Sequence, residues 1–201
     1  MNSRKGADAM LGILMAILVA TAAGAEVTGP TETVKSAVQQ VFGRAEGQIP
    51  ASGSSADRKA AARKVTANLF DFTEMSQRSL GPAWEKVSPA DQQEFVRLFG
   101  SLIANVYANR IEQYSGERIT YVGEQINGDE AKVKSSVITP KGSEIGIEYR
   151  MYRGTDGRWT VYDLYIEGFS LVGSYKAQFH RLLQRGTFDE VLKLLRDKTG
   201  S

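Results

Sequence analysis

The sequence predicts an α+β domain in which helices lie on one side of an antiparallel sheet of four strands. Before Gly116 the apolar residues recur at intervals of three and four, which is typical of amphipathic helices. From Arg118 to Glu167 they alternate with polar residues, which is typical of strands. Helical spacing returns after Gly168. Because the turns between successive strands are short, we expect an antiparallel meander.

The longest helix is predicted to begin at Ser88. Ser88 and Asp91 form a start that resembles a capping box, and Pro89 suits the first helical position. An apolar stripe from Phe95 to Tyr107 follows. Further helical segments are predicted at residues 34–42, at 56–69, as a short turn at 72–80, after a Ser170 cap through Leu183, and from a Thr187 cap through Arg196.

The four strands are predicted at residues 118–125, 131–139, 144–153 and 158–167, with hairpin turns at "NGD", "PKGS" and "GTDG". Both faces of the fourth strand contain apolar residues, so this strand is expected to be central or covered on both sides. Strict alternation places Trp159, Val161, Asp163 and Tyr165 on one face and Tyr162, Leu164 and Ile166 on the other.

The first 25 residues resemble an export signal. Two basic residues precede the apolar run "AMLGILMAILVA", and the small residues Ala23-Gly24-Ala25 suit a signal peptidase. A membrane-spanning helix needs roughly 20 apolar residues to cross about 30 Å of hydrocarbon, and this run has twelve. We therefore expect residues 1–25 to be cleaved and residues 26–201 to form a single, monomeric domain in the periplasm.

The composition narrows the class of protein. The 25 basic and 23 acidic residues nearly cancel, so no nucleic-acid partner is predicted. The chain contains no cysteine, which excludes disulfide bonds and a lipoprotein anchor. The single histidine, His180, has no cysteine near it, and no metal-ligand spacing is found. We therefore predict no metal site, no cofactor and no catalytic residue.

Asp163 is the one ionisable residue that suggests an alternative function, that of an enzyme. A carboxylate among aromatic side chains can act as a general base, and an enzyme on this fold would use Asp163 in that role. The structural interpretation is an ion pair with Lys176 or Arg150, or a carboxylate that caps backbone amides near the strand-to-helix turn. We favour the structural interpretation because no second catalytic partner can be named.

Two segments resemble one known family. "WTVYDLYIEGFSLVGSYKAQF" followed by "LLQRGTFDEVLKLLRDK" resembles the C-terminal signature of the Mla-type periplasmic phospholipid shuttle family, also called the toluene-tolerance auxiliary family. The segment from Phe70 to Gly116, with Phe-Asp-Phe, Leu80-Gly81 before Trp84 and a Ser-Pro helix start, is similar to the helical part of that family. One departure is Ser174-Tyr175-Lys176, where the family commonly has Asn-Tyr-Arg.

The resemblance implies a cone-shaped fold like that of nuclear transport factors, with helices wrapped around a curved sheet and a deep apolar cavity. The acyl chains of a phospholipid would lie in this cavity, with the head group at its mouth. The partners would be an outer-membrane lipoprotein–porin complex and an inner-membrane ABC transporter complex, and the function would be to maintain lipid asymmetry of the outer membrane. Hopanoid-associated relatives leave a second cargo class open.

The size of the cargo sets a physical requirement. Two acyl chains of about 15 methylenes each would cost on the order of 24 kcal/mol to expose to water. A carrier therefore needs an apolar cavity near or above the upper end of the usual range of about 300 to 1,000 Å³. A filled core would instead indicate a periplasmic adaptor. The expected wall residues are Phe72, Met75, Trp84, Phe95, Phe99, Leu102, Val106, Ile147, Tyr149, Met151, Trp159, Val161, Tyr165, Val172 and Tyr175.

Overall fold

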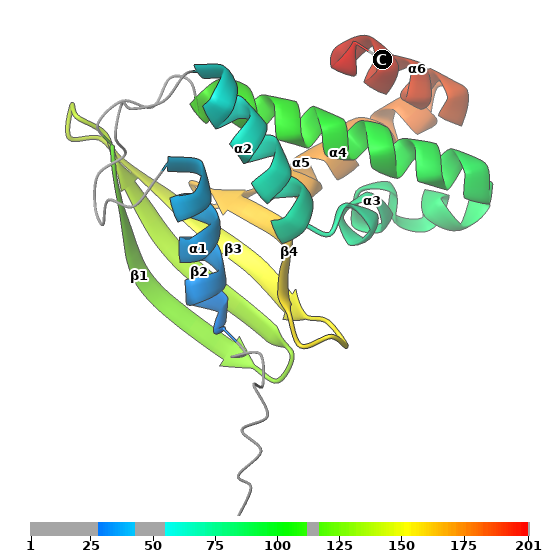
Figure 1. The fold of residues 1–201 in the computed structure, drawn as a ribbon. Coiled ribbons are helices and arrows are strands. Elements are labelled where there is room, and N and C mark those ends of the chain that lie inside the picture. Colours follow the sequence, from blue (N-terminus) through cyan, green and yellow to red (C-terminus); the bar gives the residue numbers. More distant parts are fainter. Residues whose placement is uncertain (1–27, 43–54, 112–116, 201) are drawn as a thin grey trace, which may run out of the picture.

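The structure is a computed structural model that describes residues 28–42, 55–111 and 117–200 (Figure 1). It confirms the α+β fold, with helices packed beside one curved antiparallel sheet. The expected signal segment, residues 1–25, lies outside the described residues. Within the described part of the chain, no helix has the length and apolar character needed to cross a membrane.

The sheet has five strands in the order of the chain, one more than predicted. The fifth strand is only two residues long. It forms because a tight turn at Glu167 and Gly168, both with positive φ, folds the chain back onto the fourth strand before the next helix begins. The strands are β1 (Arg118–Asn127), β2 (Glu130–Ile138), β3 (Glu144–Arg153), β4 (Trp159–Ile166) and β5 (Phe169–Ser170).

The helices lie close to the predicted segments, and their capping residues explain where most of them start. The Ser88 hydroxyl accepts from the Asp91 amide at 3.2 Å, and Thr187 and Glu190 form a complete capping box. The short helical turn expected at 72–80 is a helix of nine residues, and the 3₁₀ helix η1 was not predicted. The helices are α1 (Pro30–Phe42), α2 (Ser55–Leu69), α3 (Phe72–Leu80), η1 (Gly81–Lys86), α4 (Pro89–Ile111), α5 (Leu171–Leu183) and α6 (Phe188–Thr199).

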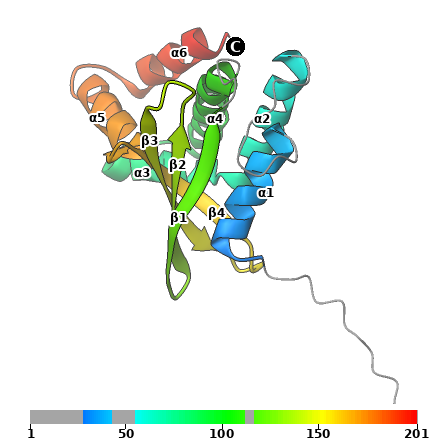
Figure 2. The same ribbon diagram turned by 90° about the vertical axis from the view of Figure 1, so that its left-hand side faces the viewer.

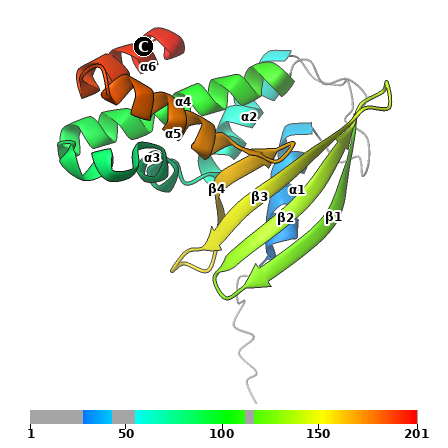
Figure 3. The ribbon, with the colours of Figure 1, turned by 180° about the vertical axis from the view of Figure 1, so that it is seen from behind.

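The helices form two groups around the sheet. Helix α1 crosses the face of the sheet that is turned toward the viewer in Figure 1, and α2 lies beside it, in front of α4 and with one end at β4, whereas α3, α4, α5 and α6 pack together beyond the β4 edge. Figure 2 shows α1 and α2 on one side of the strands, α3 and α5 on the other, and α4 between them, where it also packs against α2; Figure 3 shows that no described helix covers the opposite face of β1 and β2. The apolar residues accordingly divide into two clusters.

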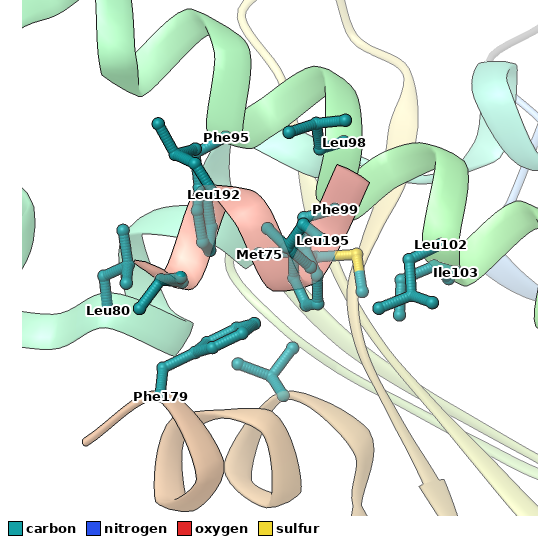
Figure 4. Packing of buried hydrophobic residues seen from close by; sticks show 12 residues of the cluster. Met75, Leu80, Phe95, Leu98, Phe99, Leu102, Ile103, Phe179, Leu192 and Leu195 are labelled. Atoms are coloured by element: carbon teal, nitrogen blue, oxygen red, sulfur yellow. The ribbon is translucent and has the colours of Figure 1, made fainter. Parts of the chain in front are cut away.

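The first cluster, which we call the helical core, lies among α3, α4, α5 and α6 (Figure 4). Phe95 is fully buried and its ring contacts Phe99, Phe179 and Phe188, with ring centroids 5.2 to 5.8 Å apart. The buried members of the helical core are Met75, Leu80, Phe95, Leu98, Phe99, Leu102, Ile103, Val172, Phe179, Val191, Leu192 and Leu195.

The second cluster, which we call the sheet layer, lies between α1, α2 and the sheet. Its sheet side comes from β2, β3 and β4, whose inward residues are adjacent in register. The buried members of the sheet layer are Val34, Ala37, Val65, Leu69, Ala131, Val133, Tyr149, Met151, Trp159, Val161 and Leu164.

A bulge in β4 changes which residues face the sheet layer. Arg150 pairs with Asp163 but the next residue, Met151, pairs with Val161, so Tyr162 is an extra residue in β4. Because one extra residue exchanges the two faces beyond it, Leu164 joins Val161 and Trp159 in the sheet layer. Tyr165 instead packs on the other face, with the Arg150 guanidinium 4.8 Å from its ring. The prediction that Trp159, Val161, Asp163 and Tyr165 share a face is therefore wrong.

Candidate functional site

The sheet layer is closed over its own side chains. Val34 of α1 and Val133, Met151 and Val161 of the sheet are all 0% exposed, so no space that holds a water molecule lies beside them. The deep apolar cavity that we expected is therefore not open at these four residues. Val38 and Val41 of α1 are partly buried and extend the same apolar stripe along the helix.

A polar contact holds the first turn of α1 against the sheet. The backbone N–H and the hydroxyl of Thr31 donate to Glu124 Oε2 at 2.8 and 2.5 Å. Glu124 belongs to β1, and its carboxylate lies at the positive end of the helix dipole. Farther along α1, the Lys35 ammonium lies 5.5 Å from the ring centroid of Tyr121 on the same strand. These contacts connect α1 to the strand at the edge of the sheet.

An open cavity of about 670 Å³ adjoins the sheet layer. It lies at the β3–β4 hairpin, next to the start of α1 and the end of α2. Leu69 and Trp159 belong both to its lining and to the sheet layer, so the cavity opens directly onto the apolar residues. Its volume falls within the usual range of about 300 to 1,000 Å³ for ligand sites and not at the upper end that we expected. Polar members of its lining include Thr33, Asn68, Asp71, Asp156 and Arg158.

Asp71 connects the helices to the sheet beside this cavity. One oxygen of its carboxylate accepts from the Glu74 amide at 2.9 Å and so caps α3, while the other accepts from the Tyr152 hydroxyl. The hydrogen bond to Asp71 raises the pKa of Tyr152 to about 12. The Asp71 amide in turn donates to the Val161 carbonyl at 2.9 Å, which fixes the α2–α3 connection against β4. Three hydrogen bonds of Asp71 therefore join α3, β3 and β4 at this wall of the cavity.

Two hydroxyls in the sheet layer have no partner within the described ranges. They are Tyr121 Oη and Ser135 Oγ, both inaccessible to solvent. Burial raises the pKa of Tyr121 well above its usual value, with further contributions from Tyr149 and Glu32. Sequence reasoning missed both residues, although Ser135 carries a visible signal. It is a polar residue at an inward position of β2, between Val133 and Val137.

Comparisons with known proteins identify the family of this chain. A family model described as MlaC protein matches residues 35–197, which is most of the chain. The chain belongs to the MlaC family. A curated relative is the intermembrane phospholipid transport system binding protein MlaC of Haemophilus influenzae, 26% identical over 167 residues that cover 80% of this chain and 77% of the relative.

A solved structure has the same fold. The phospholipid-binding protein from Ralstonia solanacearum, whose structure is described as a complex with a phospholipid, matches with a TM-score of 0.72. The match covers 86% of this chain and 98% of that one, at 23% sequence identity. The two proteins therefore share one fold over most of this chain.

The predicted wall residues divide between the two apolar clusters of this MlaC-family chain. Val106 and Tyr165 lie in neither cluster, and Val106 is 42% exposed on α4. Five predicted residues lie in the sheet layer: Ile147, Tyr149, Met151, Trp159 and Val161. The helical core holds Phe72, Met75, Trp84, Phe95, Phe99, Leu102, Val172 and Tyr175. Sequence reasoning missed the contributions to the sheet layer of α1 and α2, namely Val34, Ala37, Val65 and Leu69.

Asp163 has the structural role that we favoured. Its two oxygens accept from the Ser170 hydroxyl at 2.6 Å and from the Val172 amide at 3.0 Å, at the start of α5. The prediction that this carboxylate caps backbone amides near the strand-to-helix turn is confirmed. His180 is exposed and lies 2.9 Å from the Gln184 side chain. Across the described ranges, no group of three or more metal-ligating side chains is found.

Proposed function

We propose that this protein is a periplasmic carrier that holds the acyl chains of a phospholipid in the sheet layer and moves the lipid between the inner and outer membranes. The observation that carries the proposal is an apolar layer between α1, α2 and a curved sheet in a chain of the MlaC family. The curated relative is named for intermembrane phospholipid transport, and the solved relative is titled as a phospholipid complex. The carrier binds its cargo without changing it chemically.

The sheet layer must open to accept a lipid. Its buried side chains now contact one another, and two acyl chains that would cost on the order of 24 kcal/mol to expose need a comparable apolar surface. Movement of α1 and α2 away from the sheet supplies that surface, because contacts between side chains are exchanged for contacts with acyl chains. The open cavity beside Trp159 lies where this separation would begin.

The helical core is less suited to opening. Aromatic rings from three helices contact one another. The ring centroid of Phe99 on α4 lies 5.0 Å from that of Tyr175 and 5.6 Å from that of Phe179, both on α5, and Phe188 on α6 contacts Phe95 on α4. Arg196 of α6 also donates to Glu94 of α4 at 2.8 Å. We therefore assign lipid contact to the sheet-layer members of the predicted wall, Ile147, Tyr149, Met151, Trp159 and Val161, together with α1 and α2. The helical core serves as the frame against which the layer opens.

The location and partners follow from the same proposal. Cleavage after residue 25 would release residues 26–201 as a single domain into the periplasm. There the carrier would exchange lipid with an inner-membrane ABC transporter complex and an outer-membrane lipoprotein–porin complex, and so maintain the lipid asymmetry of the outer membrane. The basic residues and apolar run at the start of the sequence support export, and the name of the curated relative supports transport between two membranes.

The test is the lipid content of protein purified from the periplasm of a Gram-negative host. Extraction and mass spectrometry should find phospholipid bound to the wild-type protein. A matched pair of variants locates it. Val133→Phe places a larger side chain where the sheet layer would receive acyl chains, Val191→Phe places one in the helical core, and both valines are 0% exposed. The first variant should lose most of its lipid and the second should retain it. Repeated lipid-free preparations of folded wild-type protein would refute the proposal.

A further inference from the structure

The two unpartnered hydroxyls of the sheet layer face the same region. Tyr121 of β1 and Ser135 of β2 are directly opposite one another in the strand register, so their Cβ atoms are about 4.5 to 5.5 Å apart. Both side chains are on the face that packs against α1. Tyr121 is partly buried and packs against the sheet layer, and Ser135 lies between the inward residues Val133 and Val137 on β2. Ser135 is 2% exposed.

These two buried hydroxyl groups reduce the stability of the closed sheet layer. Each has an O–H donor that has left water, and neither finds an acceptor among the described residues. The neighbouring inward residues Val133, Val137 and Ile147 are apolar and offer no side-chain acceptor. Alanine and phenylalanine would fill the same space without this cost. The hydroxyls therefore indicate a ligand that brings acceptors into the layer.

A phospholipid has such acceptors directly beside its acyl chains. The polar atoms nearest to the acyl chains are the ester carbonyl oxygens, which accept hydrogen bonds and cannot donate them. Two donors set in an apolar wall match two such oxygens, while the apolar residues on either side along β2 match the chains. A head group, by contrast, carries charges that would need a charged partner in the layer.

We infer that Tyr121 and Ser135 donate hydrogen bonds to the ester carbonyl oxygens of a diacyl glycerolipid, and that the protein thereby prefers ester-linked lipids to cargo without carbonyl groups. This inference rests on the proposed function and adds a specificity to it. Opening of α1 brings the ester region against β1 and β2, and lipid binding then satisfies donors that the closed layer leaves unpaired. A polycyclic hydrocarbon cargo, which has no ester, would gain nothing from these two hydroxyls.

The experiment compares two phosphatidylcholines of the same chain length, one with ester and one with ether linkages, in competition for delipidated protein by native mass spectrometry. The wild-type protein should prefer the ester lipid by roughly fivefold to tenfold. The double variant Tyr121→Phe/Ser135→Ala should bind both lipids equally. The matched control is Ser76→Ala. It also removes a buried hydroxyl without a described partner, but this hydroxyl belongs to α3 and not to the sheet layer. The Ser76→Ala variant should still prefer the ester lipid to the ether lipid.

Thermal unfolding of the delipidated proteins provides a second readout. The double variant should unfold at the same or a higher temperature than the wild type, because it loses two unpaired polar groups. A marked decrease would mean that the hydroxyls are already satisfied within the closed protein, and would overturn the inference. Equal binding of both lipids by the wild type would overturn it as well and leave the proposed function intact. Binding of neither lipid would overturn both.

Discussion

Asp163 and Ser170 are joined by a hydrogen bond of 2.6 Å across the turn between β4 and α5. The same Ser170 oxygen accepts from the Gly173 amide at 2.7 Å, and the second oxygen of Asp163 accepts from the Val172 amide. Two backbone amides in the first turn of α5 are thus satisfied by one short relay. Asp163 itself is almost fully buried, and through these hydrogen bonds it connects β4 to the first turn of α5.

Replacement of Asp163 by asparagine should destabilise the protein. The asparagine amide has one acceptor oxygen and one NH2 group in place of two acceptor oxygens, so either the Ser170 hydroxyl or the Val172 amide loses its acceptor. We expect the free energy of unfolding in urea to fall by about 1 to 3 kcal/mol. Asp197→Asn, at an exposed position of α6, should change it by less than about 0.5 kcal/mol. Equal stability of Asp163→Asn and wild type would contradict the role assigned to the relay.

The strands and helices were predictable because their signals are local. Ser88 and Asp91 mark the start of α4, and Thr187 and Glu190 mark the start of α6, as the structure confirms. The bulge at Tyr162 was not predictable, since β4 has apolar residues at both parities and either alternation fits the sequence. Strand β5 depends on the positive φ angles of Glu167 and Gly168, which the sequence alone does not specify.

The candidate site was harder to predict than the fold. The stripe with Phe95 and Phe99 identifies a buried face of α4, but not the elements that bury it, and the structure places it against α3, α5 and α6. Conversely, Val34 and Ala37 gave a clear helical stripe that sequence reasoning left without a partner. Which stripe faces the sheet depends on long-range packing, and no periodicity encodes that.

The ion pair between Glu94 and Arg196 should make the contact between α4 and α6 sensitive to acid. The hydrogen bond from Arg196 holds the pKa of Glu94 below its ordinary value of 4.5. A lowered folded-state pKa contributes stability that is present above the ordinary value and is lost as the pH falls through the folded pKa. We therefore expect Glu94→Gln to be less stable than wild type near neutral pH, and the difference to vanish in acid.

Urea unfolding from pH 7 to pH 2.5 would measure this convergence. The control is Glu85→Gln, an exposed glutamate of η1, which should follow the wild-type curve at every pH. Added salt should shrink the Glu94→Gln effect because both partners are accessible to solvent. A difference that persists unchanged in acid would show that the charge of Glu94 is not its source.

The helical core should show the largest response to truncation. Phe95→Ala removes a fully buried ring that contacts three other aromatic rings, and leaves a cavity among four helices. We expect a loss of about 3 to 5 kcal/mol in the free energy of unfolding. Phe169→Ala is the matched control, because that ring is 77% exposed at the β4–β5 turn and should cost little. Similar losses for the two variants would contradict the division between core and surface.

The contact between Thr31 and Glu124 should control how readily α1 leaves the sheet. Glu124→Ala removes the acceptor of both the Thr31 amide and its hydroxyl, which are exposed bonds worth about 1 kcal/mol together. Opening of the sheet layer would then become about fivefold more frequent. Hydrogen exchange of the α1 amides and lipid transfer between vesicles should both accelerate. Gln40→Ala is the control, because Gln40 is exposed and its side chain donates to the Ser36 hydroxyl within α1. If both variants accelerate exchange equally, the effect arises from α1 itself and not from its attachment to β1.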